Sequence, residues 1–218
     1  MKRITKLSIF AFSFVLLFFV SCCDKKSKDS IGEIITFGSY QWRILDIQDD
    51  RALVISERVI SPMYYHISEE DITWENSSLR SYLNDEFYNS FNATDRARII
   101  EVNNINLHNP WYGTNGGSNT DDKIFLLSLA EVVKYFGNSG QLYNRPSSDA
   151  SLISDRYNSR RKAMMSEYLE CIWWLRSPGS HNSTAAYVNF EGYISVEGRK
   201  VDTLYRRYAV RPVMWLYL

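Results

Sequence analysis

Cysteine is scarce in this sequence. The chain has three cysteines in 218 residues: Cys22 and Cys23 are adjacent near the N-terminus, and Cys171 stands alone in the body. One cysteine in the body excludes a framework of internal disulfides there. Because Cys171 precedes an isoleucine and two tryptophans, we interpret it as a small buried hydrophobic residue and not as a reactive thiol.

An excess of either charge is also lacking. Lys and Arg number 25, Asp and Glu number 25, and the formal net charge is zero. Nucleic-acid binding normally requires a basic excess, so we expect no nucleic-acid partner. The chain has only five prolines, whereas 45% of its residues are hydrophobic and 15% are aromatic. This composition excludes wholesale disorder, and the length suits one domain with a real core.

Long apolar runs are confined to the N-terminus. Residues 7–20 are almost entirely apolar and follow the basic residues Lys2, Arg3 and Lys6. The run is shorter than the roughly 20 residues that a membrane-spanning helix needs, and it is typical of a signal peptide. The alternative is an N-terminal membrane anchor that is not cleaved.

The end of this run resembles a bacterial lipobox. Ser21 is small and directly precedes Cys22, whose thiol would accept the lipid; Cys23 is the alternative acceptor. We therefore expect a lipoprotein signal peptide over residues 1–21, a flexible tether over 22–33 and one domain over 34–218. Acyl chains on Cys22 would hold the exported protein on the cell membrane or the outer membrane, with the lipid membrane as a partner.

The body of the chain alternates strand and helix signals. Period-2 patterns predict antiparallel strands over residues 34–37, 40–47 and 52–56. Apolar residues three and four apart predict a helix over residues 79–91, and Thr94 is expected to cap a short helix that follows it. Residues 123–127 are expected to form a buried strand.

The C-terminal half continues in the same way. Ser128 and Glu131 form a capping box for a helix that we expect to end at Gly137. Further strands are expected over residues 172–176, 185–190, 193–196 and 208–216, with a hairpin turn at Gly192 and an irregularity at Pro212.

Two polar stretches, residues 103–122 and 146–161, predict long surface loops. The second ends in a basic cluster, which we interpret as a solvated face, an anion site being the alternative. Its members are Arg156, Arg160, Arg161 and Lys162.

Five segments resemble the bacterial domain-of-unknown-function family 6273. They read ITFGSYQWRILD (35–46), NPWYGT (109–114), DKIFLLS (122–128), WWLRSPG (173–179) and VRPV (210–213). That family is in turn similar to the C-type lectin-like fold, in the branch shared with formylglycine-generating enzymes and phage or retroelement-diversified binding proteins. The resemblance implies an α+β, C-type lectin-like mixed fold with antiparallel strands, a few short helices and long loops at one end. It also implies that the first and last strands pair.

Recognisable catalytic patterns are missing. The sequence contains no phosphate loop, no Gly-x-Ser-x-Gly nucleophile and no paired histidines, and Cys171 alone cannot supply the cysteine pair that the formylglycine-generating comparison implies. We therefore expect no enzyme, no catalytic residue, no metal and no cofactor. His66, His108 and His181 are expected in separate loops. The acidic turn at residues 119–122 is interpreted as solvated, with calcium held by Asn119, Asp121 and Asp122 as the alternative.

The remaining candidates suggest ligand binding. Aromatic, amide and basic side chains in the predicted loops and the strand beside them form the candidate set: Trp111, Tyr112, Trp174, Arg176, His181 and Asn182. The alternatives are that Trp111 plugs its own loop, that Trp173 and Trp174 are core residues, and that Arg176 and Arg211 hydrogen-bond at strand ends. We expect a membrane-anchored surface module that binds an extracellular glycan, peptide or protein. The alternative is a structural lipoprotein of the cell envelope.

Overall fold

The computed structural model describes residues 30–204 and 208–218, so the predicted signal peptide, the lipidation site Cys22 and most of the tether lie outside the described residues. A compact unit runs from Ile31 to Leu218. It begins before the predicted boundary at residue 34, because the Gly32 N–H donates to the Ile44 carbonyl at 2.8 Å. Among the described residues, no helix has the length and apolar character needed to cross a membrane.

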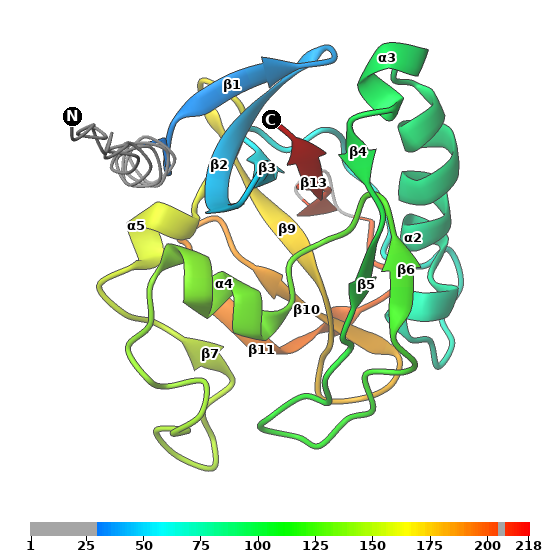
Figure 1. The fold of residues 1–218 in the computed structure, drawn as a ribbon. Coiled ribbons are helices and arrows are strands. Elements are labelled where there is room, and N and C mark those ends of the chain that lie inside the picture. Colours follow the sequence, from blue (N-terminus) through cyan, green and yellow to red (C-terminus); the bar gives the residue numbers. More distant parts are fainter. Residues whose placement is uncertain (1–29, 205–207) are drawn as a thin grey trace, which may run out of the picture. The chain divides into compact units, whose positions relative to one another are not determined.

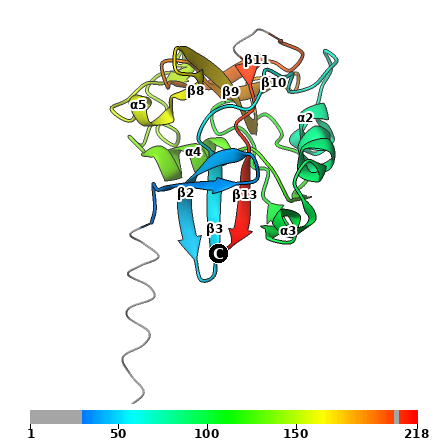
Figure 2. The same cartoon turned by 90° about the horizontal axis from the view of Figure 1, so that it is seen from above.

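The first sheet has five strands in the order β1-β2-β3-β13-β4 (Figure 1). Its antiparallel start matches the predicted pattern. Figure 2 shows β2, β3 and β13 side by side. The bounds are β1 Ile34–Phe37, β2 Tyr40–Gln48, β3 Arg51–Ser56, β4 Ile99–Ile100 and β13 Val213–Tyr217.

The last strand pairs with β3 and β4, so the expected pairing of the first and last strands is wrong. The tight turn at Gly38, where φ is +57°, folds β1 back onto one edge of β2, and β3 occupies the other edge. The free edge of β3 therefore takes β13, with Val213 opposite Ile55 and Trp215 opposite Leu53.

The second sheet has six strands. Five follow the order β12-β9-β10-β11-β7, and β8 pairs with β9 off this path. The β10–β11 hairpin turns at Gly192, as predicted, where φ is +85°. The bounds are β7 Leu152–Ile153, β8 Ala163–Ser166, β9 Leu169–Pro178, β10 Thr184–Val188, β11 Ile194–Lys200 and β12 Tyr208–Ala209. The strands β12 and β13 are separated at Pro212, as its missing N–H predicted.

The helices are short. The predicted helix over 79–91 is present but contains a π-helical turn, and Asn92, not Thr94, caps α3 by accepting a hydrogen bond from the Asp95 N–H. The helix α4 has the predicted capping box and ends at Gly137. The bounds are η1 Trp74–Asn76, α2 Ser78–Tyr82, η2 Leu83–Phe87, α3 Ala93–Arg96, α4 Leu129–Phe136 and α5 Asn158–Arg161. Predominantly antiparallel sheets with few short helices make this an α+β fold.

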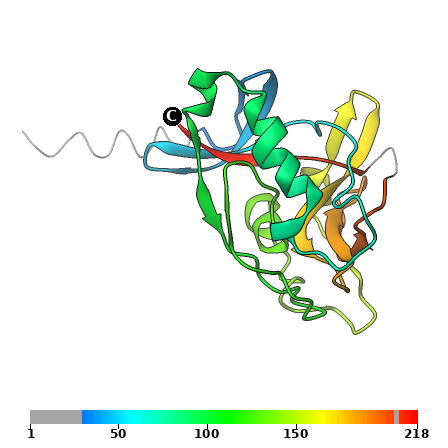
Figure 3. The ribbon, with the colours of Figure 1, turned by 90° about the vertical axis from the view of Figure 1, so that its right-hand side faces the viewer.

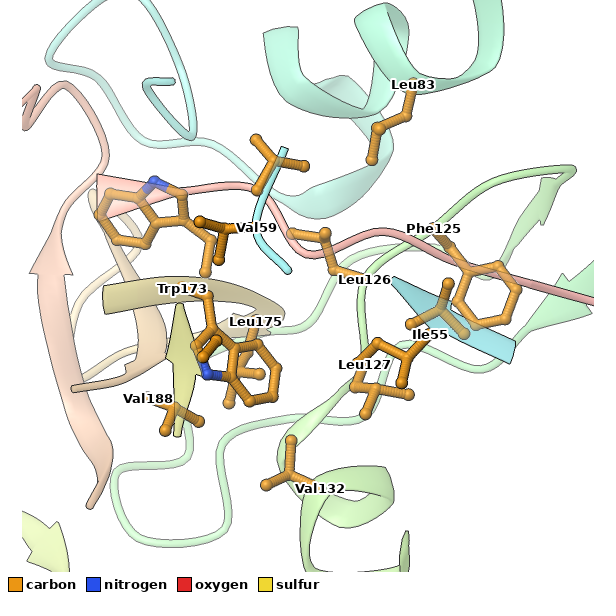
Figure 4. Packing of buried hydrophobic residues seen from close by; sticks show 14 of the residues in the cluster. Ile55, Val59, Leu83, Phe125, Leu126, Leu127, Val132, Trp173, Leu175 and Val188 are labelled. Atoms are coloured by element: carbon orange, nitrogen blue, oxygen red, sulfur yellow. The ribbon is translucent and has the colours of Figure 1, made fainter. Parts of the chain in front are cut away.

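Residues 123–127 join the two sheets and do not form the predicted strand. Phe125 exchanges two backbone hydrogen bonds with Val213 of the first sheet, and the Leu127 carbonyl accepts from the Arg176 N–H of the second. The apolar side chains of this segment are buried because they lie between both sheets and α4 (Figure 4). An apolar run is therefore explained here by burial on all sides and not by strand pairing.

Candidate functional site

Two long loops gather at one end of the compact unit (Figures 1 and 3). The first, residues 105–119, connects β5 (Val102–Asn104) to β6 (Thr120–Asp122), which pair with each other. The second, residues 138–151, follows α4. The first predicted surface loop is present, although its ends are a short strand pair. The second was predicted over 146–161 and is only partly correct, because residues 152–161 contain β7 and α5.

Asn109 fixes the first loop to the second sheet. Its side chain is buried, and its amide nitrogen donates at 2.8–3.1 Å to three backbone carbonyls, those of Pro178, Gly179 and Val196. Its side-chain oxygen accepts from the backbone N–H groups of Trp111 at 2.9 Å and Tyr112 at 3.3 Å. The loop backbone is therefore held in one conformation next to the end of β9.

Arg145 joins the two loops. Its guanidinium lies over the rings of Trp111 and Tyr112, 5.1 and 4.6 Å from their centroids, and donates to the Tyr112 hydroxyl at 3.1 Å. The Trp111 indole N–H donates to the Leu142 carbonyl of the second loop at 2.8 Å. Both rings are half-buried. The structure thus brings Trp111 and Tyr112 together and gives them a partner, Arg145, that the sequence did not reveal.

Exposed apolar side chains surround this junction. Leu107 is 58% exposed and Tyr143 is 65% exposed, and the two line one shallow groove together with Pro110 and Leu142. We call the following set the loop surface: Leu107, Pro110, Trp111, Tyr112, Tyr143 and Arg145. Large apolar side chains exposed together on ordered loops are typical of interaction surfaces.

His181 and Asn182 lie on the turn between β9 and β10 and are exposed. The His181 ring contacts the Ser180 hydroxyl at 2.9 Å, and the Asn182 carbonyl accepts from the Ile72 N–H. Among the described residues, no hydrogen bond or ring contact joins either side chain to Trp111 or Tyr112. Asn109 links the loop surface to Pro178 and Gly179, which precede this turn, so His181 and Asn182 lie beside the surface and not within it.

Trp174 lies in the interior, so the prediction that it binds a ligand is wrong. It has no exposed surface, its indole N–H donates to the Met63 carbonyl at 2.9 Å, and its ring packs against Tyr65 and Tyr208. Its neighbour Trp173 is equally buried and packs against Phe136 on the other face of β9. Both tryptophans are core residues because both faces of this strand are covered.

Arg176 is also buried, being 3% exposed, and its guanidinium is occupied by protein partners, so it is not a ligand-binding residue. It forms an ion pair with Glu131 of α4 and donates to the Leu126 carbonyl at 2.7 Å. Burial would by itself raise the pKa of Glu131, but Arg176 and the hydrogen bonds from Ser128 outweigh burial and hold that pKa below its ordinary value. The ion pair therefore fastens α4 to the second sheet, which agrees with the structural alternative for Arg176.

Asp122 has its carboxylate occupied by protein donors. It is fully buried: Oδ1 accepts from Arg80 Nε at 2.6 Å, and Oδ2 accepts at 2.7–3.0 Å from three further side chains, those of Trp74, Asn104 and Thr120. Asp121 accepts from Asn103, and the Asn119 side chain accepts from the Asn106 N–H. The prediction of a solvated turn is therefore wrong at Asp122, which is buried on β6, whereas Asn119 and Asp121 are exposed; all three side chains accept hydrogen bonds from the protein. Within residues 30–204 and 208–218, no cluster of His, Cys, Asp and Glu could hold a metal ion.

The histidines lie in separate loops, as predicted. His66 contacts Glu70 at 2.7 Å and the Ser78 hydroxyl at 2.9 Å, and the His108 ring accepts from the Gly116 N–H. Cys171 is buried without exposed surface, as its apolar neighbours predicted.

The family described as "Domain of unknown function (DUF6273)" matches residues 49–218. This match confirms the family resemblance and covers four of the five motifs; the first, over residues 35–46, precedes the matched range. No curated protein matches the chain. No solved structure matches it either.

Proposed function

The chain belongs to the DUF6273 family, and we propose that it is a lipid-anchored binding module of the bacterial cell envelope whose loop surface recognises a polypeptide ligand. The observation that carries this proposal is the pair of exposed apolar side chains, Leu107 and Tyr143, on loops that Asn109 and Arg145 hold in place. A surface fixed before binding loses little conformational entropy when the ligand arrives.

The chemistry of the loop surface favours a polypeptide over a glycan. Sugar recognition would use an open aromatic face and free polar groups, but Arg145 covers one face of both rings and the Trp111 indole N–H is already bonded to Leu142. Besides Tyr143, the large hydrophobic side chain exposed at the groove is aliphatic Leu107, and Ile105 on the same loop is 60% exposed. Aliphatic and aromatic contacts of this kind are typical of protein interfaces.

The proposal includes the C-type lectin-like class for the fold. The mixed, predominantly antiparallel sheets and the gathering of long loops at one end support it. In this arrangement the sheets form a scaffold, and the loops carry the binding residues.

Photo-crosslinking in living cells tests the loop surface. A photoreactive phenylalanine analogue replaces Tyr143 in one variant and Tyr168 in another; Tyr168 is 92% exposed on the turn between β8 and β9 and serves as the control. We expect a discrete protein adduct from position 143 and none from position 168. An adduct that carries glycan but no protein contradicts the polypeptide proposal. Equal labelling at both positions, or none at 143, favours the structural envelope alternative.

The lipid anchor is tested separately. Cys22→Ala should move the protein to the soluble fraction and abolish metabolic labelling with palmitate, because the acylated thiol is lost. Cys23→Ala is the matched control and should leave labelling intact. Labelling that persists in Cys22→Ala and disappears in Cys23→Ala would identify Cys23 as the acceptor.

A further inference from the structure

A cavity of about 430 Å³ lies between the first sheet, the C-terminal end of α4 and α5, away from the loop surface. Figure 1 shows β2, α4 and α5 around this region. Its apolar wall includes Leu45 of β2, Tyr135 of α4 and Met164 of β8. A volume of this size accommodates a small organic molecule.

Four basic side chains line this cavity against a single acidic one. Among the described residues, the basic ones are Arg43, Arg160, Lys162 and Arg211, and the acidic one is Glu57. Both carboxylate oxygens of Glu57 accept from Arg43, at 2.6 and 2.8 Å, so these two charges neutralise each other. Lys162 is ion-paired with Glu170 at 2.9 Å. Two positive charges, those of Arg160 and Arg211, are left without a carboxylate partner among the described residues.

Arg211 is a buried cation with which no carboxylate of the described residues forms an ion pair. It is 3% exposed and lies 5.5 and 5.2 Å from the ring centroids of Phe136 and Trp173. Its Nε donates to the Ser56 carbonyl at 3.0 Å, whereas Nη1 is buried with no hydrogen-bond partner in the part of the chain that the structure describes. Burial, with a contribution from Arg43, lowers the pKa of Arg211 to about 10 although Glu57 opposes this. A buried charge in this situation is stabilised by an anion.

Arg160 supplies an accessible positive charge at the same cavity. It is exposed and stacks on Tyr157 at 5.4 Å, and no other described residue forms a hydrogen bond or ion pair with its guanidinium. The basic cluster seen in the sequence is thus divided: Arg160 and Lys162 line the cavity, whereas Arg161 is fully buried and ion-paired with Asp155 at 2.9 Å. Only part of the cluster is the solvated face that we expected.

We propose that this cavity binds the dianionic phosphate monoester group of a small molecule or lipid, with Arg160 and Arg211 as its cationic partners and Leu45, Tyr135 and Met164 against its apolar body. The charge count selects the class, because two uncompensated guanidinium groups match a dianion, and guanidinium donors suit phosphate oxygens. This site is independent of the polypeptide ligand proposed for the loop surface.

Calorimetric titration of the full chain with phenyl phosphate tests the proposal. Arg160→Ala should weaken binding roughly tenfold, which corresponds to the loss of one charge-assisted hydrogen bond. Arg156→Ala is the matched control, because Arg156 is also exposed and also stacks on Tyr157, at 4.9 Å, but does not line the cavity. It should bind as the parent does. Arg211→Lys, which keeps the charge but loses the fork of donors, should also weaken binding.

Absence of phenyl phosphate binding, or equal weakening by Arg156→Ala and Arg160→Ala, would overturn the proposal, since general surface charge would explain it. Two comparison ligands separate the contributions: phenol lacks the phosphate group, and inorganic phosphate lacks the apolar ring. Both should bind more weakly than phenyl phosphate. Vesicles of phosphatidylcholine with and without phosphatidic acid distinguish the source of the group. Binding to phosphatidic acid that Arg160→Ala reduces identifies a lipid ligand, and binding of phenyl phosphate alone identifies a soluble one.

Discussion

Asp122→Asn should be among the most destabilising conservative substitutions in this domain. Asp122 lies on β6 without exposed surface, and its carboxylate connects η1, α2 and the strand pair β5–β6. It does so through donors from Trp74, Arg80 and Asn104, and it also accepts from the Thr120 hydroxyl and, at 3.5 Å, from the Asn84 amide. The substitution keeps the shape of the side chain and replaces one acceptor oxygen with an NH₂ donor.

The magnitude follows from which oxygen is replaced. An NH₂ group at the Oδ2 position would face three close donors, so we expect it at the Oδ1 position, which has one close donor, Arg80, and a distant one, the Asn84 amide at 3.5 Å. The charge-assisted bond from Arg80 is then lost, at about 1.5–3 kcal/mol, and two donors face each other, at about 1–3 kcal/mol more. The free energy of unfolding should fall by about 3–5 kcal/mol, as for other broken buried ion pairs. For a domain of this size the melting temperature should fall by roughly 6–20 °C.

Thermal unfolding followed by circular dichroism provides the measurement, with Asp121→Asn as the matched control. Asp121 is the adjacent residue on β6, but it is exposed and accepts one side-chain bond, from Asn103 at 2.8 Å. Its substitution should change stability by less than about 1 kcal/mol. Equal shifts in the two variants would refute the reasoning. The parent should also show no rise in melting temperature with added calcium, and a rise of several degrees would support the calcium alternative.

Three further predictions concern stability. Acid should destabilise the protein as the pH falls below 4.5, the ordinary pKa of a glutamate. The folded-state pKa of Glu131 is lower than this value, so the unfolded chain binds more protons in that range. Urea unfolding of Glu131→Gln should lack this part of the pH dependence of the free energy of unfolding. Deleting residues 208–218 should abolish the calorimetric transition, and an unchanged transition would contradict the role of β13. Gly192→Ala should lower the melting temperature strongly, since the added Cβ would lie 1.9 Å from the Asn158 carbonyl oxygen. Gly113 is also at positive φ but has open space around it, so Gly113→Ala should lower the melting temperature less.

Local patterns in the sequence predicted local structure well. The capping box at Ser128, the end of α4 at Gly137 and the hairpin at Gly192 were found where expected, because each depends on residues within a few positions of one another. The three-stranded start was found for the same reason. The π-helical turn and the cap at Asn92 show the limit of such patterns, since neighbouring signals compete over one or two residues.

The candidate site could be predicted only in part, because burial depends on distant contacts. Trp174 reaches the Met63 carbonyl 111 residues away, and Arg176 reaches Glu131 45 residues away. Nothing in the local sequence marks such partners. Arg145 was missed for the same reason: it is a single arginine in a polar loop, and its partner Trp111 lies 34 residues earlier.

The position of β13 between β3 and β4 has a consequence for biosynthesis. On the ribosome, β3 is complete at residue 56 and pairs with β2, but β13, which covers its other edge, begins only at residue 213. At typical translation rates this interval lasts roughly 10–30 s. Throughout it the nascent chain carries an unpaired strand edge, which is a template for aggregation. We therefore expect the growing polypeptide to depend on a holding chaperone until its final segment emerges, and premature stop codons upstream of β13 to yield insoluble or rapidly degraded fragments.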